Sequence, residues 1–349
     1  MTIECDIWLN GGNSDGFYVK GQTVSGVAEF KISKEQRFNK IIISLKGTGK
    51  LRIQQKIKIH QQVRENSYFK YELFENIEEI VQLSTKGTTY APGVYTLPFN
   101  FVVPKDIPPS FAYNEKKRGR RIKCRIKHRI KITFCQFGVI TNSTKKFKKE
   151  IYIAASVRPR VTTLPLIYGA QKQIIQLFNF QKKLIYIKVK IESSILKPGD
   201  TIKFSYEVTN DSNVNIITVR VRLMEVYTFK AQGKGKTKVA VKTSDLVLRS
   251  QRIRRRTSYR EALELKLPKT ASSVDFAKIV MRDYYVWITV VLPCPRRNIV
   301  LKIPVLVDVT LDETIVNKNN SVFINNFIQD IKKYEQSNEN KFFNLFKKM

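Results

Sequence analysis

This chain has very few histidines and no clustered cysteines. Its 349 residues include two histidines, His60 and His128, and four cysteines that show no C-x-x-C spacing. General acid–base catalysis usually needs a positioned histidine or a pair of carboxylates, and neither constellation stands out. Scattered cysteines indicate neither a zinc site nor a disulfide framework. We therefore predict a protein of a reducing compartment that is not an enzyme and needs no metal or cofactor.

Long apolar runs are missing as well. No window approaches the ~20 consecutive apolar residues with which a helix crosses a bilayer. The N-terminal segment has neither the basic region nor the apolar region of a signal peptide, so we expect none.

Acidic residues are scarce relative to basic ones. The chain has 63 Lys and Arg against 29 Asp and Glu, which gives a formal net charge of +34 at pH 7. A charge of this size concerns partners and solubility rather than fold. It would attract acidic membrane lipids, phosphorylated tails of other proteins, or nucleic acid.

Helical periodicity is absent from the first 312 residues, where β-branched and aromatic segments dominate. The short spacing of the turn signals between these segments is typical of β-sandwiches. We therefore predict an all-β fold. Its expected strands include Val24–Ile32, Lys40–Leu45, Ile122–Phe134, Ile202–Val208, Thr218–Val226 and Val286–Leu292.

The segment 90–111 is the most informative part of the chain. Pro92-Gly93 suits the centre of a type II turn, in which glycine takes a positive φ. A half-buried strand is predicted next, because apolar side chains recur at every second position: Tyr95, Leu97, Phe99 and Phe101. Since Pro98 has no N–H, this strand should lie at a sheet edge or carry an irregularity.

A weak internal repeat runs through the chain. The segment 17–24 parallels 195–202, and each reads as a turn that leads into an alternating strand. The run 97–104 has a fainter echo in 263–268, and a long strand-like segment follows each of them, 121–134 and 279–292. The repeat is too long for a solenoid, so we predict two copies of one sandwich.

These segments resemble the arrestin-fold family. Its first domain carries a recurring G-x-(Y/H)-x-(L/F)-P-F-x-F-x-(L/V)-P…P-x-S-F segment, which here runs from Gly93 to Phe111. The second copy matches the family in Leu196-x-Pro198-Gly199-Asp200-x-Ile202, and the nearest branch is that of the α-arrestins, or arrestin domain-containing proteins. The resemblance implies two tandem immunoglobulin-type β-sandwiches, over residues 1–165 and 166–312, and a polar Asn/Lys-rich tail over 313–349.

Arrestin-fold proteins are non-catalytic adaptors. The resemblance therefore implies binding to the cytoplasmic tails of membrane receptors or transporters, with links to endocytosis, sorting or ubiquitination. It implies a cytoplasmic protein that is peripheral at the plasma membrane or endosomes. Many α-arrestins recruit ubiquitin ligases through a P-P-x-Y motif, but here Pro108-Pro109-Ser110-Phe111 ends in Phe, so a ligase link is not predicted. The first-strand basic pair of visual and β-arrestins is also missing, because Ile3–Leu9 contains Glu4 and Asp6 and no cation.

A strongly basic strand is the candidate partner-binding site. From Lys116 to Lys131 there are ten Lys or Arg residues and no acid. The cations alternate with mostly apolar residues, so a strand places them on one face about 6.6 Å apart. That spacing is below the ~8 Å Debye length, and the row repels itself unless anions neutralise it.

The alternative interpretation is a solvated strand face whose lysines prevent pairing at a sheet edge. It explains one or two of the basic residues but not five in register. The predicted anion- and partner-binding residues are Arg121, Lys123, Arg125, Lys127, Arg129 and Lys131, with Lys145, Lys146, Lys148 and Lys149 as an extension.

Two further features have both a functional and a plain interpretation. Arg255-Arg256-Thr257-Ser258 has the pattern that basophilic kinases read, which makes Ser258 a candidate phosphosite or a chance match. In the tail, apolar residues of the segment 322–334 share one helical face. The amphipathic helix predicted there would either dock on the body of the protein or anchor it to a membrane or partner.

Two classes of function follow from the sequence. The motifs and the basic strand favour an adaptor whose partners are receptor or transporter tails, with anionic membrane lipids as further ligands. Charge alone would also suit a nucleic-acid-associated protein. The basic strand, however, lacks the aromatic residues that stack on bases, and no helix-based DNA-reading motif is visible. We therefore expect no specific nucleic-acid binding.

Overall fold

The computed structural model describes residues 3–11, 16–59, 62–75, 81–83, 87–117, 120–137, 142–155, 165–175, 182–231, 237–275 and 277–310. All regular secondary structure within these ranges is β-strand, which confirms the all-β prediction. The helix predicted in the tail, residues 313–349, lies outside the described residues. The chain forms two compact units, of which the first comprises residues 1–158, 222–248 and 272–287.

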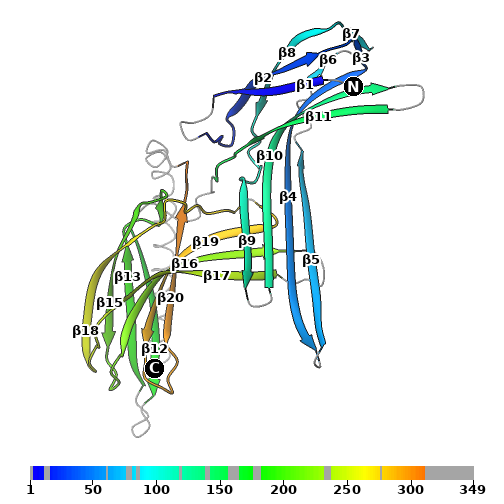
Figure 1. The fold of residues 1–349 in the computed structure, drawn as a ribbon. Coiled ribbons are helices and arrows are strands. Elements are labelled where there is room, and N and C mark those ends of the chain that lie inside the picture. The colour runs from blue at the N-terminus through cyan, green and yellow to red at the C-terminus, as the bar shows by residue number, and fades with distance from the viewer. Residues whose placement is uncertain are drawn as a thin grey trace, which may run out of the picture. The chain divides into compact units, whose positions relative to one another are not determined.

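Two facing sheets form the N-terminal sandwich (Figure 1). The three-stranded sheet has the order β1 (Ile3–Asn10), β2 (Thr23–Ile32) and β8 (Gly93–Val102). The larger sheet has the order β11 (Asn142–Ile151), β10 (Arg120–Phe137), β4 (Lys40–Ile59) and β5 (Gln62–Glu75). Two shorter strands complete it, since β6 (Val81–Leu83) pairs with β4 and β9 (Phe111–Lys117) pairs with β10. A separate two-stranded sheet consists of β3 (Gln36–Phe38) and β7 (Thr88–Tyr90).

The strand predicted within 90–111 is β8, and it lies at the end of its sheet. An edge position suits Pro98, which pairs in register with Val27 of β2. The predicted type II turn is wrong, because Gly93 does not take a positive φ and is already the first residue of the strand.

The second copy of the sandwich also has two sheets. One has the order β12 (Leu166–Ile175), β13 (Lys182–Ile191), β15 (Thr201–Asn210) and β18 (Thr257–Lys266). The other has the order β14 (Ile195–Leu196), β20 (Ile299–Val307), β19 (Val280–Val291), β16 (Thr218–Lys230) and β17 (Thr237–Arg249). Buried aliphatic residues alternate with more exposed ones along β13 and β15, as expected for sheets with one buried face.

The internal repeat predicts a shared turn, and the structure contains it in both copies. Gly21 and Gly199 both take a positive φ, of 80° and 84°. The residue after each glycine caps the turn, since Gln22 Oε1 accepts from the Val19 amide at 2.9 Å and Asp200 Oδ2 accepts from the Lys197 amide at 2.7 Å. The backbone carbonyl of that same residue accepts a second hydrogen bond from the end of the repeated run. The donor is Val103 N at 2.9 Å in the first copy and Leu267 N at 2.8 Å in the second. The duplication is therefore present at the level of single hydrogen bonds.

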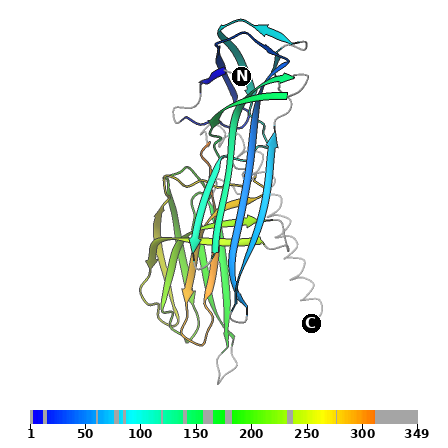
Figure 2. The same cartoon turned by 45° about the vertical axis from the view of Figure 1, so that its right-hand side comes forward.

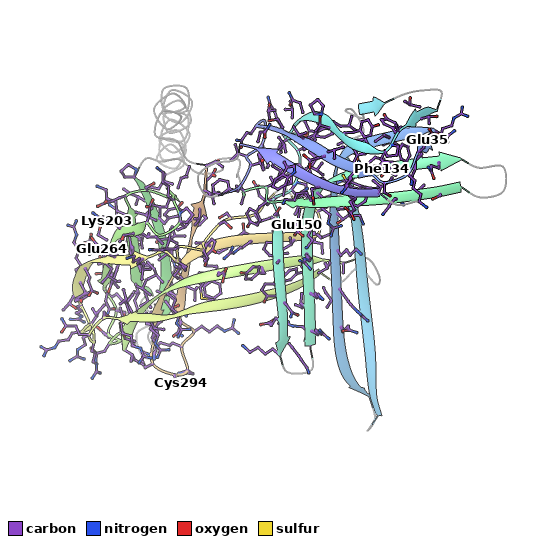
Figure 3. The ribbon with its side chains drawn as sticks, turned by 45° about the horizontal axis from the view of Figure 1, so that its top comes forward. Glu35, Phe134, Glu150, Lys203, Glu264 and Cys294 are labelled. Carbon is purple, nitrogen blue, oxygen red and sulfur yellow. The ribbon has the colours of Figure 1, made fainter. Side chains whose placement is uncertain are left out.

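The strands β4 and β10 are long enough to bury their apolar faces in two successive cores, and they run side by side in both views (Figure 1, Figure 2). The first core lies within the N-terminal sandwich and includes Leu45, Ile130 and Phe134, the last of which is labelled in Figure 3. The second core belongs to the same compact unit. It is formed by Leu51, Ile53, Ile122, Cys124 and Ile126 with Tyr227, Phe229 and Ile279, among others.

A half-buried carboxylate lies beside this second core. Glu225 Oε1 accepts hydrogen bonds from the Tyr227 hydroxyl at 2.6 Å, Arg282 Nε at 2.8 Å and the Tyr284 hydroxyl at 3.1 Å. Burial opposes ionisation of Glu225, but these hydrogen bonds and the Arg282 charge lower its pKa overall. The carboxylate therefore stays ionised at neutral pH and holds Arg282 in place.

Candidate functional site

The predicted alternation along β10 is confirmed. Its residues Arg121, Lys123 and Arg125 are exposed, and Lys127, Arg129 and Lys131 are half-buried. The residues between them are buried: Ile122, Cys124, Ile126, His128, Ile130 and Ile132. All six cations therefore share the face of the sheet that points away from the core.

Pairing with β4 places further cations directly opposite those of β10. In register, Lys123 faces Arg52, Arg125 faces Lys50, and Arg129 faces Lys46. Residues that face each other across an antiparallel pair project to the same side, and like charges in that position are destabilising. These three residues of β4 were not predicted as part of the site. Their alternation with Leu45, Leu51 and Ile53 was visible in the sequence, but their place beside β10 depends on strand pairing.

The strand β11 extends the same face in part. Lys148 stands opposite Lys131, and Lys146 stands opposite Thr133. The other two predicted lysines point elsewhere. Lys145 donates a hydrogen bond to the carbonyl of Ile3 on β1, and Lys149 stands opposite Ile130, which lies on the buried side of β10. Of the four predicted lysines, the structure therefore brings Lys146 and Lys148 to the face.

We call this surface the basic face. Lys116 of β9 joins it opposite Arg121. Its cations are Lys46, Lys50, Arg52, Lys116, Arg121, Lys123, Arg125, Lys127, Arg129, Lys131, Lys146 and Lys148.

One acid stands among the described side chains of the basic face. Glu150 of β11, labelled in Figure 3, faces Arg129 in register and forms an ion pair with Lys127. The hydrogen bond from Lys127 lowers the pKa of Glu150, and the charges of Arg125 and Arg129 act in the same direction. On β5, whose side chains lie outside the description, Glu75 stands opposite Lys46 in register. The described part of the face is thus strongly cationic.

The inner face of β10 carries a histidine that is kept neutral. His128 is completely buried, and its Nε2 lies 2.9 Å from the carbonyl oxygen of Pro108. Burial lowers the pKa of His128 to about 4, although the contact with Pro108 opposes that shift. His128 is therefore part of the core, as its position opposite the cations predicts, and it is remote from any solvent-accessible substrate.

The candidate phosphosite is exposed. Ser258 lies on β18 opposite Thr209 of β15, and Arg256 just before it takes a positive φ of 56°. Its accessibility is compatible with modification, and its phosphorylation stays a prediction.

Neither a metal site nor a membrane span emerges from the described residues. They contain no group of three His, Cys, Asp or Glu side chains that could hold a metal ion. Within the same part of the chain, no helix is long and apolar enough to cross a membrane.

The fold defines a duplicated β-sandwich protein, and its first copy carries a strongly cationic face. Family comparison makes the class specific. The N-terminal domain of arrestin (or S-antigen) matches residues 5–158, and the C-terminal domain of arrestin (or S-antigen) matches residues 181–310. The chain therefore belongs to the arrestin family. A search of curated proteins found no match.

Membership of this family gives the chain an adaptor role in general terms, since arrestins are generally non-catalytic adaptors. The finer assignments stay predictions: the α-arrestin branch, the domain boundaries after residues 165 and 312, and the anion-binding role of β10.

Proposed function

We propose that this protein is an arrestin-like adaptor of the α-arrestin type. It binds the cytoplasmic tails of membrane receptors or transporters and links them to endocytosis, sorting or ubiquitination. It works in the cytoplasm, peripherally at the plasma membrane or endosomes. Two consecutive arrestin domains support this proposal, because they account for most of the chain.

The observation that supports a binding site on the basic face is the set of like charges that face each other on β10, β4 and β11. The pairs are Lys123 with Arg52, Arg125 with Lys50, and Lys131 with Lys148, and like charges in this position repel each other. A partner with negative charge removes that repulsion, so binding is favoured at this face over the rest of the surface.

The second copy of the sandwich provides an internal comparison. Its strand β19 follows the echoed run as β10 does in the first copy, and Arg282 is its sole cation. The residues between its buried positions include Asp283, Tyr285 and Trp287. The fold thus forms without a basic row at this position, which favours a role in binding for the row on β10.

The downstream link differs from that of many α-arrestins. Pro108 and Pro109 are buried and no P-P-x-Y motif is present, so a ligase must be reached indirectly or through another segment.

Affinity purification from cells tests this function. Extracts are treated with nuclease and washed at physiological salt, and the wild type is compared with two matched variants. The first variant changes Lys123, Arg125, Lys127, Arg129 and Lys131 to Gln. The second removes the same charge from exposed positions of the second copy by changing Lys188, Lys190, Lys203, Arg260 and Lys266 to Gln.

We expect membrane receptors, transporters or sorting components with the wild type and the second variant, and their loss from the first. Recovery of chromatin or ribonucleoprotein that disappears on nuclease treatment, without membrane proteins, would contradict the adaptor function.

A further inference from the structure

A turn on the second copy carries a cluster of arginines that has no place in the proposed function. This turn, residues 252–256, leads into β18, and Arg252, Arg254, Arg255 and Arg256 are all exposed in it. Arg260 follows on β18 and is exposed as well. Because β18 stands last in the order of its sheet, this segment lies at a sheet edge. We call residues 252–256 the arginine turn.

Asparagines from a neighbouring loop hold the arginine turn in place. The side chain of Asn210 is completely buried, and its Nδ2 donates to the carbonyl of Arg254 at 3.0 Å. Nε of Arg256 donates to Asn213 Oδ1 at 3.1 Å. Arg256 also takes a positive φ of 56°, a conformation that costs free energy for a residue with a side chain. These hydrogen bonds therefore fix the course of the backbone and the direction of Arg256.

Two hydroxyl groups follow the arginine turn, and their surroundings differ. Thr257 and Ser258 each have two arginines at the third and second positions before them. The Thr257 hydroxyl donates to the carbonyl of Arg254 at 2.8 Å, which keeps it within the turn. The Ser258 side chain is exposed, and among the described residues no hydrogen bond uses its hydroxyl. Ser258 is therefore the hydroxyl that is free to react.

We propose that a basophilic protein kinase phosphorylates Ser258 and that Arg256 and Arg260, on either side of it, then hold the phosphate. In the transfer step Ser258 Oγ forms a bond to the γ-phosphorus of ATP. The bond from that phosphorus to the bridging oxygen breaks, ADP leaves with the electron pair, and the hydroxyl proton passes to a base of the kinase. This inference is independent of the proposed adaptor function.

The positions of the two arginines suit a phosphate. Residues two apart on a strand share a face and lie about 6.6 Å apart, so Arg260 is on the face of Ser258. Arg256 stands two residues before Ser258, at the end of the arginine turn. A phosphoserine carries a charge of about −1.5 to −2 and three acceptor oxygens. Guanidinium groups match such oxygens with two parallel hydrogen bonds.

Two acids near Ser258 compete for these arginines. Glu207 of β15 stands opposite Arg260 in register, but it also stands opposite Lys188 of β13. Asp211 is exposed in the loop that follows β15. The phosphate carries more charge than either carboxylate, so it takes Arg260 while Glu207 keeps Lys188. Phosphorylation thus offsets roughly two positive charges of the arginine cluster and acts as a switch of its charge.

Phosphorylation of the purified full chain tests the site. The probe is ATP with the catalytic subunit of cyclic-AMP-dependent protein kinase, which reads Arg-Arg-x-Ser, and mass spectrometry locates the phosphate. The wild type is compared with Ser258→Ala and with the matched variant Thr257→Ala. We expect phosphate on Ser258 in the folded wild type and in Thr257→Ala, and its loss from this segment in Ser258→Ala.

Phosphorus NMR tests the arginine contacts. The second pKa of the phosphoserine is measured in the folded chain and in the same phosphorylated chain in urea, where the neighbouring sequence is identical. Cations close to the phosphate favour its dianion, so this pKa should be lower in the folded chain, by ~0.5–1 pH unit. Arg260→Gln, which lies outside the kinase motif, should shrink the difference. The control Lys203→Gln, farther along the same outer face, should leave it unchanged.

Each half of the proposal has results that would overturn it. No labelling of the wild type, labelling of Thr257 in place of Ser258, or labelling of Ser258 only after unfolding would reject the site. The same second pKa in the folded and unfolded chains would reject the arginine contacts, as would an Arg260→Gln variant that matches the wild type.

Discussion

The outer faces of the two sandwich copies carry charge in opposite arrangements. On the first copy, cations face cations: Arg125 stands opposite Lys50, and Lys131 stands opposite Lys148. On the second copy, Glu207 of β15 stands between Lys188 of β13 and Arg260 of β18. Lys203 and Glu264, which also face each other on β15 and β18, are labelled in Figure 3.

The difference shows which charges serve the fold and which do not. Opposite charges that face each other across strands contribute modestly to stability, and like charges oppose it. On the second copy, opposite charges therefore face each other across strands, whereas on the first copy several like charges do. Since both copies share the same turn and the same strand register around it, the fold does not require the basic face.

The largest effect concerns charge inside the first compact unit. Glu225→Gln removes the carboxylate that Arg282 contacts at 2.6 Å while Arg282 stays mostly buried. We expect a loss of ~3–5 kcal/mol in the free energy of unfolding, measured by urea denaturation. The matched change on the basic face, Glu150→Gln, should cost ~1 kcal/mol or less because water screens its pair with Lys127. Equal losses in the two variants would contradict this contrast.

The two faces of β10 differ in that one carries charges exposed to water and the other a buried neutral histidine. The pH dependence of the free energy of unfolding should reveal this difference. The folded-state pKa of His128, about 4, is below its unfolded value near 6.5, so protonation favours the unfolded state. The stabilisation by neutral His128 is fully present above about pH 6.5 and is lost as the pH falls toward 4. The loss amounts to about 3 kcal/mol in the free energy of unfolding. His128→Phe should flatten this part of the stability profile. A profile of the same slope in that variant would show that His128 is not the titrating group.

The duplicated turn predicts equal effects in the two copies. Gly21→Ala and Gly199→Ala each force an L side chain into positive φ, where no neighbouring atom lies within 3.4 Å. Each should lower the free energy of unfolding by ~1–2 kcal/mol through backbone strain alone. A neutral effect at either position would show that the two turns are not equivalent.

The smallest effects have opposite signs on the two outer faces. Arg125→Glu turns a like-charge pair with Lys50 into an attractive one and should raise stability by ~0.5 kcal/mol. Glu207→Lys places a third cation between Lys188 and Arg260 and should lower it by a similar amount. Both changes should shrink in high salt. The same sign for both variants at low salt would contradict the comparison.

The sequence was sufficient for features that depend on neighbouring residues along the chain. Alternation within one strand predicted the exposure of Lys123 and the burial of His128, and the spacing around Gly21 and Gly199 predicted the repeated turn. It was insufficient where another strand decides the outcome. Lys46 and Arg52 join the basic face through pairing with β10, which is a long-range contact that local pattern does not encode.

Lys145 shows a second limit. It was grouped with Lys146 and Lys148 by charge, but an odd spacing along a strand turns a side chain to the other face. The basic face needs β4, β10 and β11 in register, so no single segment of the sequence contains it.

Lysine footprinting tests the central claim most directly. The full chain is acylated with and without bound anionic vesicles, and the protection of each lysine is read by mass spectrometry. We expect protection of Lys50, Lys123 and Lys148 on the first copy, and unchanged reactivity of Lys188, Lys190 and Lys266 on the second. Equal protection on both copies, or protection confined to the second, would contradict it.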